Sequence, residues 1–349
     1  MNFCVYLDTG LEIHGYLVPD GFSTEPKVHI RTDGAERVIE VTCWVFVEGA
    51  RSQGLHKTGN VGFVLSEDNV PGISVAAHVE VSDPESGLVI YRRAQPGEFI
   101  PKKVLRLETS YVPNSELDLC LKPHFQFFEH RVEHHGFETV RQMLEILHQP
   151  SVYVSGRILL KNFRVYINYN IDTTLISLND PFYELAIRLI VFSRFNRQSF
   201  SFISPRDKSL FKPVMDLFDG LVVQDEAAVV RAIRNAPKET LNLLSSPFVR
   251  QLVADNPSDT PSLDNVSQAL DALSQFTLFD AGRDEKTYPQ HIAELFGLPE
   301  GTVRMRPQLD AVHRLADFLR KIGRVEQLLE ADMVLYHFIQ KAEDRAQRV

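Results

Sequence analysis

Three residues at the end of an apolar run have the types and spacing to bind a phosphate group. Ser155, Gly156 and Arg157 lie in PSVYVSGRILLKNF (150–163), between a strand-like run and a helical pattern. A phosphate at a strand-to-helix turn needs free backbone N–H groups and the positive end of a helix dipole. Ser155 supplies a hydroxyl, Gly156 a close approach to the backbone, and Arg157 or Lys161 a cation. From spacing alone, a tight turn in an α/β core is the favoured interpretation, and an anion site is the alternative.

A second apolar run ends in a helix start. In TTLISLNDPFYELA (173–186), Asp180 has the side chain of an N-cap, and Pro181 suits the first helical position. Two successive strands would thus direct helix N-termini toward one edge of a sheet. That edge is where open α/β sheets bind ligands.

A histidine-rich segment offers a metal-site alternative. His130, Glu133 and His134 have the spacing of inverted-motif zinc peptidases. Their segment, 116–149, is predicted to be mostly helical, with breaks at Pro123 and Gly136. The two histidines would then share a helix face opposite the apolar stripe and stay solvated. Chance clustering is the favoured interpretation, and no metal is expected.

Two further residues are assigned to the core. Asp332 falls in the middle of the apolar stripe of the last helix, which predicts a buried carboxylate that ties this helix to a neighbouring loop. A catalytic carboxylate is the alternative for Asp332. Trp44 lies in a strand-like run and is predicted to face inward. A sugar-stacking platform is the alternative for Trp44, since flat apolar faces suit pyranose rings.

The elements that position these residues fall into two groups. Residues 1 to about 95 contain seven short runs rich in Val, Ile, Tyr and Phe, separated by turn residues. They predict an antiparallel β-sandwich domain over 1–98, followed by a linker at 92–103. Residues 99–349 carry three strand-like runs, SVYVSG, TTLISLND and FTLFDAG, among helical patterns. These predict an α/β domain with a small parallel sheet, extensive helical cover and a helical insertion at about 196–272.

Composition limits the partners and the compartment. The chain has 349 residues and a net charge of −9 without long blocks of one sign, which argues against a nucleic-acid footprint. No apolar run is long enough for a membrane span, and the first residues do not read as a signal peptide. Three scattered cysteines argue against a disulfide framework. A cytoplasmic location is the simplest expectation.

These parts, in this order, resemble the sulfotransferase superfamily over roughly residues 104–340. The resemblance rests on strand-SGR-helix, strand-NDP-helix, then ALDALSQFTLFDAGRDEKTYPQHIAELFGLP and LLEADMVLYHFIQ. It implies a P-loop sulfotransferase-like fold and 3′-phosphoadenosine 5′-phosphosulfate as the cofactor. The predicted cofactor-binding residues are Ser155, Gly156, Arg157, Asn179, Asp180 and Arg188. Arg157 and Lys161 would stabilise charge on the transferring sulfuryl group.

Departures from the family pattern leave two functions open. Val154 stands where the family has a Lys or Arg, Asn179 where it has the Arg of Arg-Asp-Pro, and Ile187 where it has a serine. The N-terminal region resembles β domains attached to bacterial surface-polysaccharide enzymes, which implies a glycan acceptor held partly by that domain. One prediction is therefore a transferase that moves sulfate to a sugar hydroxyl in surface-polysaccharide biosynthesis. The other is a non-catalytic glycan-binding or scaffold protein that keeps the fold. The oligomeric state is left open.

Overall fold

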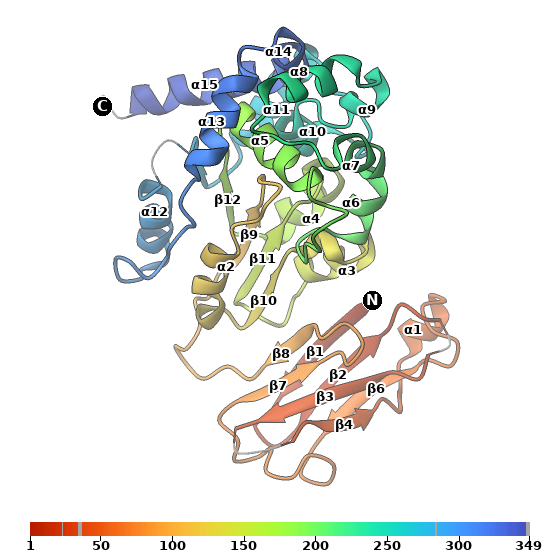
Figure 1. Cartoon of the computed structure of the whole chain (residues 1–349). Helices are drawn as coiled ribbons and strands as arrows, with labels where there is room; N and C mark the ends of the chain where they lie inside the picture. The colour runs from red at the N-terminus through yellow and green to blue at the C-terminus, as the bar shows by residue number, and fades with distance from the viewer. Residues whose placement is uncertain (23, 34–36, 283–284, 347–349) are drawn as a thin grey trace.

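The N-terminal region consists of two antiparallel four-stranded sheets. The computed structural model describes residues 1–22, 24–33, 37–282 and 285–346. The sheets are ordered β1-β2-β6-β5 and β4-β3-β7-β8 (Figure 1). Their elements are β1 (Asn2–Asp8), β2 (Ile13–Val18), β3 (Lys27–Thr32), β4 (Ile39–Thr42), β5 (Val45–Phe46), α1 (Glu48–Ser52), β6 (Asn60–Leu65), β7 (Val79–Ser82) and β8 (Val89–Arg92).

Alternating apolar residues give these sheets a common core. In β2, Ile13, Gly15 and Leu17 are buried, as expected for every second residue of a strand. Gly15 is required by a close contact, because a Cβ atom there would lie 2.5 Å from the carbonyl oxygen of Cys4 and 2.6 Å from the ring of Phe63. Buried side chains of both sheets belong to one apolar cluster.

The rest of the chain is built on one parallel sheet of five strands, ordered β10-β11-β9-β12-β13. The strands are β9 (Lys103–Leu107), β10 (Phe127–His130), β11 (Val152–Gly156), β12 (Thr173–Ser177) and β13 (Leu278–Asp280). The central strand β9 is buried on both faces, which is typical of parallel sheets covered by helices.

Helices cover both faces of this sheet and its carboxyl end (Figure 1). Leu105 and Leu107 of β9 belong to the apolar cluster that includes α3, α4, α10, α11 and α15, whereas Val104 belongs to the cluster of α2 and α12. A third cluster joins α5, α7, α8, α9, α13 and α14. The helices are α2 (Ser115–Leu121), α3 (Phe137–Leu144), α4 (Leu160–Asn170), α5 (Pro181–Phe192), α6 (Pro205–Leu210), α7 (Lys212–Phe218), α8 (Glu226–Asn235), α9 (Lys238–Asn242), α10 (Pro247–Val253), α11 (Val266–Leu273), α12 (Thr287–Phe296), α13 (Asp310–Leu319), α14 (Gly323–Leu328) and α15 (Glu330–Ala346), with 3₁₀ turns η1 (Lys122–His124), η2 (Val132–His134) and η3 (Leu263–Asn265).

The N-terminal sheets pack against the amino-terminal end of the parallel sheet. The ring of Phe3 stacks on that of Phe127, the first residue of β10, with centroids 6.0 Å apart. Gln126 and Gln149, which precede β10 and β11, donate to carbonyl oxygens of Arg92 and Ile90 at 2.7 and 3.0 Å. Residues from both sides of this junction share one apolar core.

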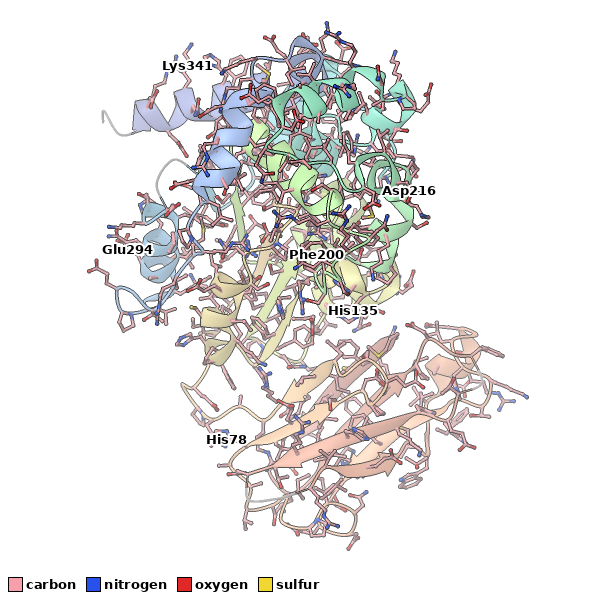
Figure 2. The ribbon with its side chains drawn as sticks, in the orientation of Figure 1. His78, His135, Phe200, Asp216, Glu294 and Lys341 are labelled. Carbon is pink, nitrogen blue, oxygen red and sulfur yellow. The ribbon has the colours of Figure 1, made fainter. Side chains whose placement is uncertain are left out.

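Charged side chains far from the sheets extend outward. Asp216 on α7, Glu294 on α12 and Lys341 on α15 are exposed and point away from the ribbon (Figure 2). Among the described residues, no helix combines the length and apolarity that a membrane crossing requires.

Several expectations about elements need correction. One of the seven strand-like runs of the N-terminal region, RVIEVTCWVFVEG (37–49), forms two strands, β4 and β5, in different sheets. The segment 116–149, predicted to be mostly helical, contains β10 between α2 and α3. β9 lies at the end of the predicted linker, so the parallel sheet has five strands where three were predicted. A P-loop sulfotransferase-like fold remains a prediction, whereas the α/β class with a helix-covered parallel sheet is confirmed.

Candidate functional site

The sheet topology identifies one crevice as the expected ligand site. From the central strand β9 the chain crosses to β10 on one side of the sheet, whereas from β12 it continues to β13 on the other side. Open α/β sheets bind ligands at the carboxyl ends of strands where the chain direction reverses in this way. In this protein that point lies between β9 and β12.

A pocket occupies this crevice, with a cavity volume of about 140 Å³. We call it the switch-point pocket. Its polar lining comes mainly from β9 and β12, from the segments that follow them and from the segment before α13: Arg106, Glu108, Thr109, Ser110, Asn114, Ser177, Asn179, Arg306 and Gln308. Its apolar lining comes mainly from α5 and α13: Ile187, Ile190, Val191, Leu309 and Val312. Mostly apolar walls with a few convergent polar groups are typical of small-molecule sites.

In the loop after β9, backbone N–H groups donate to the carboxylate of a residue in the same loop, Glu108. Glu108 accepts hydrogen bonds from the backbone N–H groups of Ser110 and Asn114, at 3.0 and 2.7 Å. Its Oε2 also accepts from Arg106 Nη2 at 2.9 Å. A carboxylate therefore takes up loop N–H groups of the kind that bind a phosphate oxygen in anion sites.

A buried ion-pair network supports this loop from below. Arg106 donates to both carboxylate oxygens of Asp118 on α2, at 2.8 and 2.9 Å, and the hydroxyl of Tyr153 donates to Asp118 at 2.7 Å. Burial disfavours the charge on Arg106, but Asp118 and Glu108 outweigh this effect and raise the pKa of the guanidinium. Burial, together with Asp118, raises the pKa of Tyr153. The network fixes the β9 loop rigidly, as a preformed site requires.

On the β12 side, amide and hydroxyl groups face the pocket. Gln308 Nε2 donates to Asn179 Oδ1 at 3.3 Å, and Ser177 Oγ donates to Asp280 at 3.0 Å. Tyr288 also lines the pocket and is only 1% exposed, yet its hydroxyl has no hydrogen-bond partner among the described residues. Buried hydroxyl groups are normally paired, so Tyr288 marks an unmet polar group beside the pocket.

The predicted Ser155–Arg157 turn lies elsewhere and is occupied by an internal carboxylate. Glu133 Oε2 accepts from the backbone N–H of Arg157 at 2.9 Å. A Cβ atom on Gly156 would lie 2.5 Å from the same oxygen, so the space that glycine opens is filled by Glu133. Ser155 is buried, and its hydroxyl has no partner among the described residues.

The two predicted catalytic cations are both in ion pairs. Arg157 Nη2 lies 2.8 Å from Asp207 and 3.1 Å from Glu133. Coulombic attraction to these carboxylates outweighs burial and raises the pKa of Arg157. Lys161 is partly exposed and contacts Asp255 at 2.6 Å. Neither residue lines the switch-point pocket.

The residues predicted around the second turn are separated by the structure. Asn179 lines the switch-point pocket. Asp180 caps α5, as expected, by accepting from the N–H groups of Phe182 and Tyr183 at 2.9 and 3.1 Å. Arg188 contacts Glu184 one helical turn earlier and lines a different cavity, which it shares with Arg157. Of the six predicted cofactor ligands, one lies in the switch-point pocket.

The β9 loop was missed by sequence reasoning. The strand KVLRL (103–107) is short, interrupted by Arg106 and preceded by a charged linker, so its alternation is weak. The following ETSYVPNS contains a Pro-Asn pair before an apolar helix, which is a usable helix-start signal. That signal could have identified Glu108, Ser110 and Asn114.

The structure does not place the predicted zinc motif on a helix. His130 ends β10 and His134 belongs to the turn η2, so the two side chains do not share a helix face. Glu133 is engaged by Arg157. Burial lowers the pKa of both histidines. No group of three or more metal-ligating side chains is present in the described part of the chain.

The two core assignments have opposite outcomes. Asp332 is fully buried and accepts from the N–H groups of Phe248 and Val249, at 3.0 and 2.8 Å, so it ties α15 to the start of α10. Its predicted structural role is confirmed. Trp44 is 65% exposed, so the expectation of a core tryptophan is wrong. It lies in the link between β4 and the edge strand β5, where no strand pairing holds the side chain inward.

In comparisons with known proteins, no protein-family model matches the chain, and no curated protein sequence matches it significantly.

Proposed function

We propose that this protein binds one sugar unit of a glycan in the switch-point pocket and does not transfer a group to it. The observation that carries the proposal is the use of two glutamates inside the strand-end loops. Glu108 accepts from two N–H groups of the β9 loop, and Glu133 accepts from the N–H of Arg157. The fold then serves as a scaffold for recognition.

An activated phosphate donor would compete directly with these glutamates. A phosphosulfate group needs loop N–H groups as hydrogen-bond donors. Charge-assisted hydrogen bonds contribute about 1.5–3 kcal/mol each, so releasing those of Glu108 would cost several kcal/mol. The displaced carboxylate would also repel the incoming anion. A neutral ligand avoids both costs.

The size and lining of the pocket suit a sugar ring. A cavity near 150 Å³ holds one six-membered ring, and this pocket measures about 140 Å³. Sugar hydroxyl groups both donate and accept, which matches the amides of Asn179 and Gln308 and the hydroxyl of Ser110. The apolar side chains of α5 and α13 match the C–H faces of a ring.

Calorimetric titration with monosaccharides tests this proposal. Glucose, galactose, mannose and N-acetylglucosamine, each at millimolar concentration, are the probes. We expect heat from at least one of them and at least tenfold weaker binding in Asn179→Ala. Asn168→Ala, an exposed asparagine on α4, is the matched control and should bind like the wild type. Absence of binding by every sugar, including short oligosaccharides, would contradict the proposal.

A second candidate is the sulfotransferase activity that the resemblance implies. The position of the pocket supports it, because nucleotides bind at this point in many α/β sheets. Titration with 3′-phosphoadenosine 5′-phosphate distinguishes the two candidates. Micromolar binding that weakens in Asn179→Ala would favour a transferase that uses the switch-point pocket. Binding that weakens in Lys161→Ala would instead favour the Ser155–Arg157 turn, with Arg157 and Lys161 in the predicted roles. Lys161 is partly exposed, so this variant should fold.

Among the described residues of the N-terminal sheets, none lines the switch-point pocket. These sheets pack at the amino-terminal end of the parallel sheet, whereas the pocket opens at the carboxyl end. The expectation that the β domain helps to hold a ligand at this site is therefore not supported by the geometry. A glycan contact on those sheets would be a separate one.

A further inference from the structure

A second cavity, lined mainly by arginine residues, lies next to the β9 loop. Tyr111 borders it, whereas the neighbours Ser110 and Val112 line the switch-point pocket. Its arginines come from four different elements, namely the turn after β11, α5, α6 and α10. They are Arg157, Arg188, Arg206 and Arg250. Asp207 is the only acidic residue that lines this cavity within the described part of the chain. We call it the arginine pocket.

Three of the four arginines contact carboxylates within the described part of the chain. Arg157 contacts Glu133 and Asp207, at 3.1 and 2.8 Å. Arg206 also contacts Asp207, at 3.1 Å, and its side chain is 44% exposed at the edge of the pocket. Two negative charges therefore balance these two guanidinium groups. Glu184 balances a third, since it lies 2.9 Å from Arg188. Among the described residues, only Arg250 of the four contacts no carboxylate.

Arg188 presents two uncommitted nitrogens. Its Nε donates to Glu184 Oε1 at 2.9 Å, but its two terminal nitrogens have no hydrogen-bond partner among the described residues. The side chain is only 6% exposed. Its guanidinium lies over the rings of Tyr111 and Phe211, at 5.1 and 5.9 Å, which fixes its orientation. Neither nitrogen is among the fully buried unpaired polar atoms of the described residues, so both are accessible from the arginine pocket and can donate to an acceptor there.

Arg250 lacks a carboxylate partner within the described chain. It donates instead to neutral oxygens, among them the backbone carbonyls of Asn242, Leu243 and Asp259. Burial and the nearby charge of Arg188 lower its pKa to about 10, so it is still charged at neutral pH. An arginine that is 5% exposed thus carries a charge without a direct counter-ion. The charges of Asp332 and Asp259 offset part of this cost from a distance, and a bound anion would offset more of it.

We propose that the arginine pocket binds a tetrahedral oxyanion, a phosphate or sulfate group that is either free or at the end of a small molecule, with Arg188 as its main ligand. The planar guanidinium fork donates to two oxygens of such a group at once. The cavity volume is about 70 Å³, roughly that of two molecules of liquid water. This space fits one oxyanion and is too small for a nucleotide.

The test is calorimetry and thermal unfolding of the full chain with inorganic phosphate and with inorganic sulfate. Ligand binding to the folded state must raise the unfolding temperature in proportion to the logarithm of ligand concentration above the Kd. We expect millimolar or tighter binding of both anions and a rising unfolding temperature. Sodium chloride at matched ionic strength controls for screening. No specific effect of either anion would overturn the proposal.

Two variants locate the binding site. Arg188→Met should weaken phosphate binding at least about tenfold, the equivalent of one charge-assisted contact. Arg206→Ala should weaken it severalfold and should fold even if Arg188→Met does not. Arg231→Ala, an exposed arginine on α8, is the matched control and should bind like the wild type. Phosphate affinity unchanged in Arg206→Ala and in a folded Arg188→Met would place the anion elsewhere and refute the assignment.

Further arms identify the source of the anion and separate this site from the sugar pocket. Tighter binding of glucose 6-phosphate than of inorganic phosphate would indicate a phosphate ester, and equal affinity would indicate the free ion. Asn179→Ala should leave phosphate affinity unchanged. The anion site can therefore be confirmed or lost independently of the sugar proposal.

Discussion

At the scale of single residues, glutamate side chains accept hydrogen bonds from the loop N–H groups that would bind phosphate oxygens in a phosphate site. Glu108 and Glu133 accept loop N–H groups at the ends of neighbouring strands, and Glu184 accepts from the N–H of Tyr111 at 2.8 Å. Sequence reasoning found the Ser155–Arg157 turn because its residue types are local. It could not find Glu133 as the occupant, because that contact joins residues 24 positions apart.

Two buried tyrosines on the same face of the sheet provide a prediction about unpaired hydroxyl groups. Tyr288→Phe removes a hydroxyl without a partner and should raise the free energy of unfolding by about 1 kcal/mol. Tyr153→Phe removes the donor to Asp118 and should lower it by about 1–3 kcal/mol. Urea unfolding of both variants measures the difference. Equal destabilisation would mean that the Tyr288 hydroxyl is also paired.

The Tyr288→Phe variant also tests whether Tyr288 contacts a bound sugar. If the hydroxyl donates to a bound sugar, Tyr288→Phe should weaken sugar binding severalfold while it stabilises the unliganded protein. Titration of the variant with the best sugar probe measures this. Unchanged affinity would remove Tyr288 from the site.

At the scale of elements, strand prediction succeeded where the apolar run was uninterrupted. β11, β12 and β13 were predicted from SVYVSG, TTLISLND and FTLFDAG. β9 carries Arg106, whose charge is compensated by Asp118 and Glu108 once the chain has folded. The sequence of β9 therefore does not resemble a central strand. β10 contains FFEH, and its neighbouring histidines fit a helical spacing equally well. Tertiary contacts decide both cases.

The contact between α15 and α10 predicts a pH-dependent stability. Burial raises the pKa of Asp332 from its ordinary value to about 7. The folded state therefore holds a proton that the unfolded state releases between about pH 4 and pH 7. For this group, stability falls as the pH rises through that window.

Asp332→Asn isolates this contribution. The free energy of unfolding of the variant, relative to the wild type, should increase between pH 4.5 and pH 7.5, because only the wild type must charge a buried group. Urea unfolding at both pH values gives the double difference. A difference that does not change with pH would show that Asp332 is ionised throughout.

At the scale of the whole molecule, two sequence regions share one core. The linker at 92–103 predicts a boundary between two domains, and across this boundary Phe3 stacks on Phe127 and the apolar cluster continues. The N-terminal ammonium group also donates to Thr139 Oγ1 of α3 at 3.0 Å. Composition and turn signals reveal a linker, but they carry no information on the surfaces that it brings together.

A shared core predicts that both regions unfold together. Trp44, the single tryptophan, lies in the N-terminal sheets, so its fluorescence reports on that region, whereas helical ellipticity reports on the rest. The two unfolding curves in urea should coincide.

Phe3→Ala should lower the free energy of unfolding by about 3–5 kcal/mol and shift both curves together, since Phe3 is fully buried at the junction. Trp44→Ala, at a mostly exposed position, should change the free energy of unfolding by less than about 0.5 kcal/mol, as measured by ellipticity. A fluorescence transition that precedes the loss of helix would show that the sheets unfold independently and that the junction is weaker than its contacts imply.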